Sequence, residues 1–281
     1  MADAALDCLH EEVRALVEDR GWELTPIQKA SAVELVAGAD RILVAPTGSG
    51  KTEAAVLPLA SRALVEGWTG LSILYITPLR ALNRDIDRRL KNLLEPLGMS
   101  VGLRHGDTTQ KERTRQSKNP PNLLVTTPET TQIMLLGSRL RQHLAGVRAV
   151  VLDEVHDLAA SERGSQLLVG LERISALEGA GEPFQRIGLS ATVGNPEEMA
   201  KWVSGRAEPI HGPAPRTTKV TVHRETPTPE DDLLAGEWGI SPKSIAAFRH
   251  LAKTLIEDPP SLVFVNSRST AESVAQRLAT I

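Results

Sequence analysis

The chain has 281 residues, 41% of them hydrophobic and 24% charged, the profile of a soluble globular protein with one large domain, or one domain and part of another. Its apolar runs are too short to span a bilayer, and its single cysteine, Cys8, excludes internal disulfides and cysteine-based metal clusters, which favours the reducing cytoplasm. The formal net charge of −3 argues against binding of nucleic acid by bulk attraction alone, and the seven histidines show no spacing typical of a metal site.

The first predicted elements are two helices. Apolar residues recur at helical spacing from Leu6 to Val17, which predicts one amphipathic helix there. Pro26 opens a second segment, in which apolar residues from Ile27 to Val36 follow the same period.

From residue 41 onward, short strands and helices alternate. The predicted strands are 41–45, 72–77, 123–126, 149–153, 186–190 and 219–223. Several are near-continuous aliphatic runs, as expected for strands that are buried on both faces of a parallel sheet. This order predicts an α/β fold with a mostly parallel central sheet and helices on both faces.

The composition changes after residue 225. Residues 226–242 contain three prolines, two glycines and an acidic patch, which predicts a linker or a surface excursion. A helix from residue 243 to 257, a strand over 261–265 and a helix over 270–281 are predicted after it. We therefore expect one domain over 1–225, a linker over 226–243 and the start of a second domain over 244–281.

A glycine-rich loop joins the strand that ends at residue 44 to the next helix. Residues 45–52 have the spacing of a Walker A loop, except that alanine replaces the first glycine. Gly48 and Gly50 allow backbone N–H groups to point at phosphate oxygens, and Lys51 offers a charge to the β- and γ-phosphates. The Thr52 hydroxyl is a candidate Mg²⁺ ligand. ATP and Mg²⁺ are thus the predicted cofactors, bound by Thr47, Gly48, Ser49, Gly50, Lys51 and Thr52.

Asp153 and Glu154 follow the strand at 149–152. In an open α/β sheet, ligands bind at the carboxyl ends of the strands, where these two carboxylates lie. Asp153 is the candidate to hold Mg²⁺ and Glu154 the candidate to orient the attacking water, with Lys51 as a further catalytic residue. Acids at the start of a helix are the alternative interpretation. His156 is either a surface histidine or a group that couples this site to neighbouring segments.

These motifs, in this order, resemble those of superfamily 2 helicases. Residues 22–28 resemble the Q motif, which implies that Gln28 reads adenine and that Thr25 belongs to the nucleotide site. Residues 153–156 resemble the DEVH form of motif II. The tripeptide Ser190-Ala191-Thr192 resembles motif III, which in the family links the state of ATP to the binding of nucleic acid. The resemblance implies a RecA-like P-loop NTPase domain.

Two further motifs are similar to those that line the single-strand track of this family. Residues 77–82 resemble motif Ia, and residues 126–129 resemble motif Ib. Arg80, Arg84 and Arg88 recur every four residues opposite an apolar stripe, so their side chains are predicted to face solvent and phosphates. The residues implied to contact single-stranded DNA or RNA are Thr77, Arg80, Arg84, Thr127 and Glu129.

The stretches 153–174 and 192–198 are similar to the large helicase-related (Lhr) proteins. Residues 263–268 resemble motif IV, which opens a second RecA-like domain; in the family, motifs V and VI and a winged-helix module follow. The resemblance implies an ATP-dependent helicase that moves 3′ to 5′ and acts in DNA repair. In the family, motif VI supplies an arginine finger that speeds hydrolysis, and these 281 residues do not include that motif. We therefore expect them alone to bind ATP and nucleic acid but to hydrolyse ATP poorly.

Two other functions fit part of the sequence. One is a non-catalytic, ATP-dependent module that binds nucleic acid, which the missing arginine finger favours. The other is a P-loop ATPase of the transporter or protein-remodelling type. The Q motif, the DEVH box and the Ser-Ala-Thr motif, in that order, argue against the second.

Overall fold

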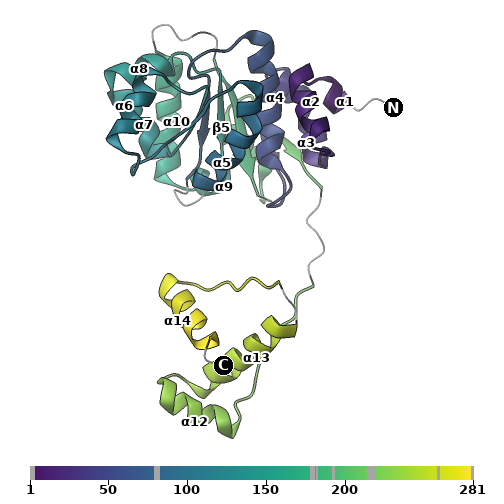
Figure 1. Cartoon of the computed structure of the whole chain (residues 1–281), viewed down its shortest axis with the longest axis vertical. Helices are drawn as coiled ribbons and strands as arrows, with labels where there is room; N and C mark the ends of the chain where they lie inside the picture. The colour runs from purple at the N-terminus through teal and green to yellow at the C-terminus, as the bar shows by residue number, and fades with distance from the viewer. Residues whose placement is uncertain are drawn as a thin grey trace. The chain divides into compact units, whose positions relative to one another are not determined.

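The computed structural model describes residues 4–78, 83–177, 181, 183–191, 194–213, 219–257 and 260–279. The chain forms two compact units, Met1–Arg216 and Thr217–Ile281 (Figure 1). None of the helices within the described ranges combines the length and the apolar character that a bilayer crossing needs.

A parallel sheet of seven strands forms the centre of the first unit. The strands are β1 (Arg41–Val44), β2 (Ile73–Ile76), β3 (Val101–Arg104), β4 (Leu123–Thr126), β5 (Ala149–Leu152), β6 (Gln185–Ser190) and β7 (Glu208–His211). Their order across the sheet is β3-β4-β2-β5-β6-β1-β7, and every neighbouring pair is parallel. The predicted parallel sheet is confirmed.

Alternate side chains of the strands enter two separate hydrophobic cores, one on each face of the sheet. Tyr75 of β2 belongs to the first core, whereas its neighbours Leu74 and Ile76 belong to the second. The first core is covered by α1 (Ala4–Asp7), α2 (Glu11–Asp19), α3 (Pro26–Val36), α4 (Lys51–Glu66) and α5 (Asn83–Leu94). The second is covered by α7 (Pro128–Leu136), α8 (Ser138–Leu144), α9 (Val155–Ala159), α10 (Glu162–Ser175) and α11 (Pro196–Val203), so the prediction of helices on both faces is confirmed.

The amino-terminal helix predicted from Leu6 to Val17 is in fact two helices, α1 and α2. His10 interrupts it as the N-cap of α2, where its Nδ1 accepts a hydrogen bond from the backbone N–H of Glu12 at 3.3 Å. Two short elements, η1 (Glu95–Leu97) and α6 (Gln110–Lys118), flank β3 along the chain.

The second unit contains three helices among its described residues: α12 (Pro229–Trp238), α13 (Pro242–Glu257) and α14 (Arg268–Leu278). Helix α12 lies inside the range expected as a linker, because Thr228 and Asp231 cap it reciprocally and Pro229 opens it. Asp231 also pairs with Arg249 of α13 at 3.1 Å. The boundaries 1–225, 226–243 and 244–281 stay a prediction.

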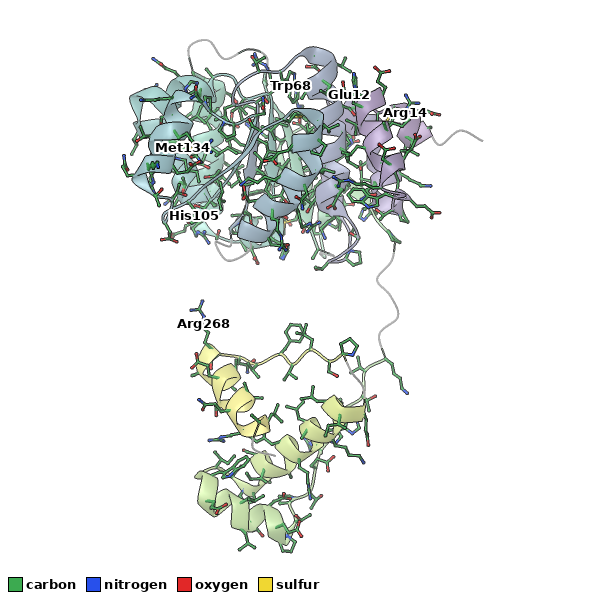
Figure 2. The ribbon with its side chains drawn as sticks, in the orientation of Figure 1. Glu12, Arg14, Trp68, His105, Met134 and Arg268 are labelled. Carbon is green, nitrogen blue, oxygen red and sulfur yellow. The ribbon has the colours of Figure 1, made fainter. Side chains whose placement is uncertain are left out.

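The strands predicted at 219–223 and 261–265 are wrong, since both segments are irregular in the structure. A strand needs a hydrogen-bonded neighbour, and no strand lies among the described residues of the second unit. In the segment that leads to Arg268 (Figure 2), Leu262 and Phe264 are 80% and 85% exposed.

Candidate functional site

The glycine-rich loop lies at the carboxyl end of β1 and passes directly into α4. Gly48 and Gly50 have φ angles of 78° and 86°, in the left-handed region that the predicted curled backbone requires. Gly50 is the N-cap of α4, a helix of 16 residues, so the unpaired N–H groups of its first turn face the loop. This arrangement suits a phosphate group.

Gln28 connects helix α3 to this loop. Its Oε1 accepts a hydrogen bond from the backbone N–H of Thr25 at 2.8 Å, and its Nε2 donates to the carbonyl of Gly50 at 3.1 Å. A Cβ atom on residue 50 would lie only 2.5 Å from Gln28 Nε2 and would force the Gln28 amide to move. Close packing is therefore a second reason, besides the φ angle, for glycine at this position. The structure therefore brings the two predicted residues Thr25 and Gln28 against the loop.

Lys51 begins α4 and turns its side chain back over the loop. Its Nζ donates to the carbonyl oxygens of Ala45 at 2.6 Å and Pro46 at 3.1 Å. Burial lowers the pKa of the ammonium from its usual 10.5, and the carboxylates of Glu154 and Asp153 oppose that shift. The two acids therefore lie near enough to act on the lysine.

Asp153 follows β5 and is held by two hydrogen bonds. Its Oδ1 accepts from the backbone N–H of Glu154 at 3.0 Å, and its Oδ2 accepts from the hydroxyl of Tyr75 at 2.9 Å. Burial, with a smaller contribution from Glu154, raises the pKa of the Asp153 carboxyl to about 6, while the Tyr75 hydrogen bond and Lys51 act in the opposite direction. Each carboxylate oxygen retains a lone pair for a further ligand.

Tyr75 is a site residue that sequence reasoning missed. It is the only tyrosine of the chain and is fully buried on β2, beside the strand β5 that Asp153 follows. Burial raises the pKa of its hydroxyl well above the usual 10, so the group keeps its proton and acts as a donor; the nearby Thr52 side chain partly offsets the rise in pKa. Tyr75 thus lies near both Thr52 and Asp153, the two predicted Mg²⁺ ligands.

A single cleft of about 210 Å³ contains the loop and the acidic pair. The residues that line it are Thr47, Gly48, Gly50, Lys51, Thr52, Asp85, Ile86, Arg89, Asp153 and Glu154. The predicted loop and the two predicted carboxylates thus share one cavity, although they are about a hundred residues apart along the chain. Ser49 does not line it.

Arg89 of α5 forms a wall of the cleft, where its guanidinium pairs with Glu53 of α4 at 2.7 Å. The helical period places Arg88 on the solvent side, with its side chain 75% exposed, and turns its neighbour Arg89 toward the cleft. Sequence reasoning missed Arg89. Arg89 lies three positions after Ile86 and therefore on the same side of the helix, so helical spacing could have predicted that its side chain faces the cleft.

Glu154 has a φ angle of 49° and is the only residue other than glycine with a positive φ in the described ranges. Such a conformation is disfavoured for a side chain with a Cβ and is concentrated at functional sites. Beside it, His156 Nδ1 lies 3.2 Å from the Ser190 hydroxyl and 3.5 Å from Glu154 Oε2. The histidine thus connects the end of β5 to the end of β6. Ala191 follows Ser190, and Thr192 lies outside the described residues.

The residues expected along a nucleic-acid track are only partly described. Arg80 and the Arg84 side chain lie outside the described residues. Thr77 and Thr127 are buried, and the Thr127 hydroxyl caps α7 by accepting from the Thr130 N–H at 3.4 Å. The contact of these two hydroxyls with nucleic acid stays a prediction.

Glu129 pairs with Arg163 of α10, a residue that sequence reasoning missed. Arg163 Nη2 also donates to the carbonyl of Pro78 at 3.2 Å. One guanidinium thus joins the end of β2 to the start of α7, the two segments expected to form the track.

Known proteins resemble this chain over nearly its whole length. Residues 25–199 match the DEAD/DEAH box helicase family. The chain is 37% identical over 271 residues to the "Lhr helicase/ probable uracil glycosylase" of Mycolicibacterium smegmatis, and the matched region covers 90% of the chain and 17% of that protein. It is 36% identical over 280 residues to the "ATP-dependent helicase Lhr-Core" of Methanothermobacter thermautotrophicus, and that match covers 91% of the chain and 31% of that protein.

The structure also resembles solved structures. That of Mycobacterium smegmatis helicase Lhr bound to ssDNA and AMP-PNP superposes with a TM-score of 0.79 at 34% identity, over 98% of this chain and 36% of that one. The chain therefore spans about a third or less of the length of these relatives.

Proposed function

The chain belongs to the DEAD/DEAH box helicase family, and we propose that it is the ATP-binding part of an Lhr-type helicase. In this proposal ATP hydrolysis drives movement along single-stranded DNA or RNA. The observation that carries it is the single cleft lined by Lys51 and Thr52 on one side and by Asp153 and Glu154 on the other. A nucleotide bound in that cleft can contact the phosphate-binding residues and the two carboxylates at the same time.

Mg²⁺ is the proposed metal, with Thr52 and Asp153 as its protein ligands. The donor set fits, because hydroxyl and carboxylate oxygens are the groups that Mg²⁺ prefers, and Asp153 keeps free lone pairs inside the cleft. When bound, the ion neutralises charge on the phosphate oxygens. Around it, the Tyr75 hydroxyl fixes the orientation of the Asp153 carboxylate.

The remaining polar groups have distinct proposed roles. The amides of the loop and the Lys51 ammonium bind the phosphates, and Glu154 orients the water that attacks the γ-phosphate. Gln28, already against Gly50, offers its amide to adenine. His156 transmits changes at the γ-phosphate to Ser190 and to the segment beyond β6. A second RecA-like domain and a winged-helix module complete the proposed full-length protein.

This function is tested by the binding of fluorescent single-stranded DNA and RNA, with and without AMP-PNP and Mg²⁺. We expect nucleotide-dependent binding that weakens steeply with salt, because phosphate contacts dominate. DNA and RNA in parallel identify the preferred strand. Single-turnover cleavage of ATP then separates an enzyme from a non-catalytic module. Failure of the chain to bind nucleotide in the presence of Mg²⁺ would contradict the proposal.

Replacing Tyr75 with phenylalanine should weaken the Mg²⁺ site without changing the loop. A hydrogen bond to a charged group contributes about 1.5 kcal/mol, so the Mg²⁺ concentration for half-maximal nucleotide binding should rise about tenfold. Because that bond also favours the ionised carboxyl, its loss raises the pKa of Asp153 further and moves the acid limit of Mg²⁺-dependent binding to higher pH.

The measurement is a Mg²⁺ titration of fluorescent nucleotide binding, with a series in EDTA. Affinity in EDTA should not change. Thr126→Val is the matched control, because it removes a buried hydroxyl that has no hydrogen-bond partner from the adjacent strand β4. An unchanged Mg²⁺ midpoint in Tyr75→Phe, or an equal shift in Thr126→Val, would reject this role for Tyr75.

A further inference from the structure

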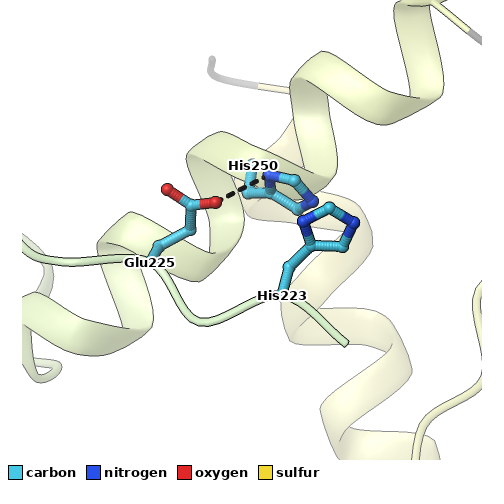
Figure 3. Close-up of side chains that lie close together, drawn as sticks. All are labelled: His223, Glu225 and His250. Carbon is cyan, nitrogen blue, oxygen red and sulfur yellow. Dashed lines mark ion pairs between the residues drawn. The ribbon is translucent and has the colours of Figure 1, made fainter. Parts of the chain in front are cut away.

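Three potential metal ligands meet in the second unit, and none of them is a lining residue of the nucleotide cleft. His223 and Glu225 belong to the irregular segment before α12, and His250 belongs to α13. Figure 3 shows the side chains of His223 and Glu225 both directed from that segment toward His250. Residues 223 and 250 lie 27 positions apart, which explains why the spacing of histidines along the sequence did not predict this group.

The distances favour a shared ion. Glu225 Oε1 lies 2.9 Å from His250 Nδ1, and one donor atom from each of the three residues lies within 4.8 Å of the others. Two ligands of one tetrahedral zinc ion lie roughly 3.3 Å apart. The glutamate and His250 are therefore already near the required separation, and His223 has to approach by at most roughly 1.5 Å.

The position of His223 allows that approach. Its ring lies on that of His250, with the centroids 4.3 Å apart and the planes inclined by 35°. To direct a nitrogen at a common ion, the ring has to rotate out of this stack. Its side chain is exposed and the segment that carries it is irregular, so the contact known to be lost on rotation is the stack on His250.

The donor chemistry selects the class of metal. Two imidazole nitrogens and one carboxylate oxygen are a set that Zn²⁺ accepts, whereas Mg²⁺ and Ca²⁺ prefer oxygen alone. We propose that His223, Glu225 and His250 bind a Zn²⁺-class transition-metal ion, with water at the fourth position. Such an ion cross-links the segment before α12 to α13. This proposal does not depend on the helicase assignment.

The test is calorimetric titration of Zn²⁺ into the full chain after removal of any histidine tag, in a buffer that contains Mg²⁺ to occupy oxygen sites. We expect one Zn²⁺ per chain, and at least a roughly tenfold loss of affinity in each of His223→Ala, Glu225→Gln and His250→Ala. Glu225→Gln keeps the shape of the side chain, so its loss of affinity is not explained by misfolding. Far-UV circular dichroism checks the fold of all three.

Two controls remove other donors. His211→Ala removes an exposed histidine from the first unit, and Cys8→Ser removes the only thiol. Both should bind Zn²⁺ as the unaltered chain does. Co²⁺ gives a second readout, since a tetrahedral site produces visible absorption bands that His250→Ala should abolish. The proposal would be overturned if the unaltered chain bound no Zn²⁺, or if the three ligand variants bound it as tightly as the unaltered chain does. The cluster would then be a His–Glu ion pair with a stacked ring.

Discussion

Replacing Lys51 with alanine should lower the affinity for ATP–Mg²⁺ by about a hundredfold or more. Lys51 is the cation at the loop, and charge-assisted hydrogen bonds contribute up to about 3 kcal/mol each, where 1.4 kcal/mol corresponds to a factor of ten. Because the side chain also donates to the carbonyls of Ala45 and Pro46, its removal affects the loop as well as the ligand. Loss of binding should therefore be large.

Lys51→Gln separates the effect on the ligand from the effect on the loop, and Lys201→Ala is the control. Glutamine keeps a donor for the loop carbonyls but removes the charge, so it should lose most of the affinity while melting at the temperature of the unaltered chain. Lys201 is an exposed lysine of α11 outside the cleft, and its alanine variant should bind normally. Measured by fluorescent nucleotide titration, near-normal affinity in both Lys51 variants would show that the nucleotide binds elsewhere.

Replacing Glu154 with glutamine should slow ATP cleavage strongly while leaving nucleotide binding nearly intact. The amide has the same size but is a poor proton acceptor, and general-base groups contribute roughly 10² to 10⁴ in rate. We expect single-turnover ATP cleavage to fall by at least about a hundredfold. The affinity for ATP–Mg²⁺ should stay within about threefold, because Asp153 and Lys51 hold the nucleotide.

Glu197→Gln is the matched control for this variant. Glu197 is an exposed carboxylate in the first turn of α11 and lines no part of the cleft. Rapid-quench measurement with excess protein and saturating single strand compares the two. If Glu154→Gln cleaves ATP as fast as Glu197→Gln does, then Glu154 does not orient the attacking water.

The central strands could be predicted because their burial on both faces leaves near-continuous aliphatic runs. The edge strands β3 and β7 could not, since Gly102 and Pro209 interrupt any apolar pattern and an edge strand needs less of one. The apolar segment 261–265 has a strand composition, but composition does not supply the neighbouring strand that a ladder requires.

The loop and the acidic pair could be predicted because each is a local motif at the end of a strand. Their neighbours could not. Tyr75, within an aliphatic run, has the sequence signature of a core residue, and only the pairing of β2 with β5 brings its hydroxyl to Asp153. Similarly, Arg163 is an ordinary helical arginine until the fold places it against Glu129 and Pro78. Contacts between distant segments carry no local signal.

A crystal structure of the chain grown with AMP-PNP and Mg²⁺ would locate the nucleotide. We expect the triphosphate to lie under the amides between Gly48 and Thr52, with Mg²⁺ coordinated by the Thr52 hydroxyl and reached by Asp153 directly or through one water. A nucleotide outside this cleft, or an ion too far from Asp153 for either contact, would contradict this expectation.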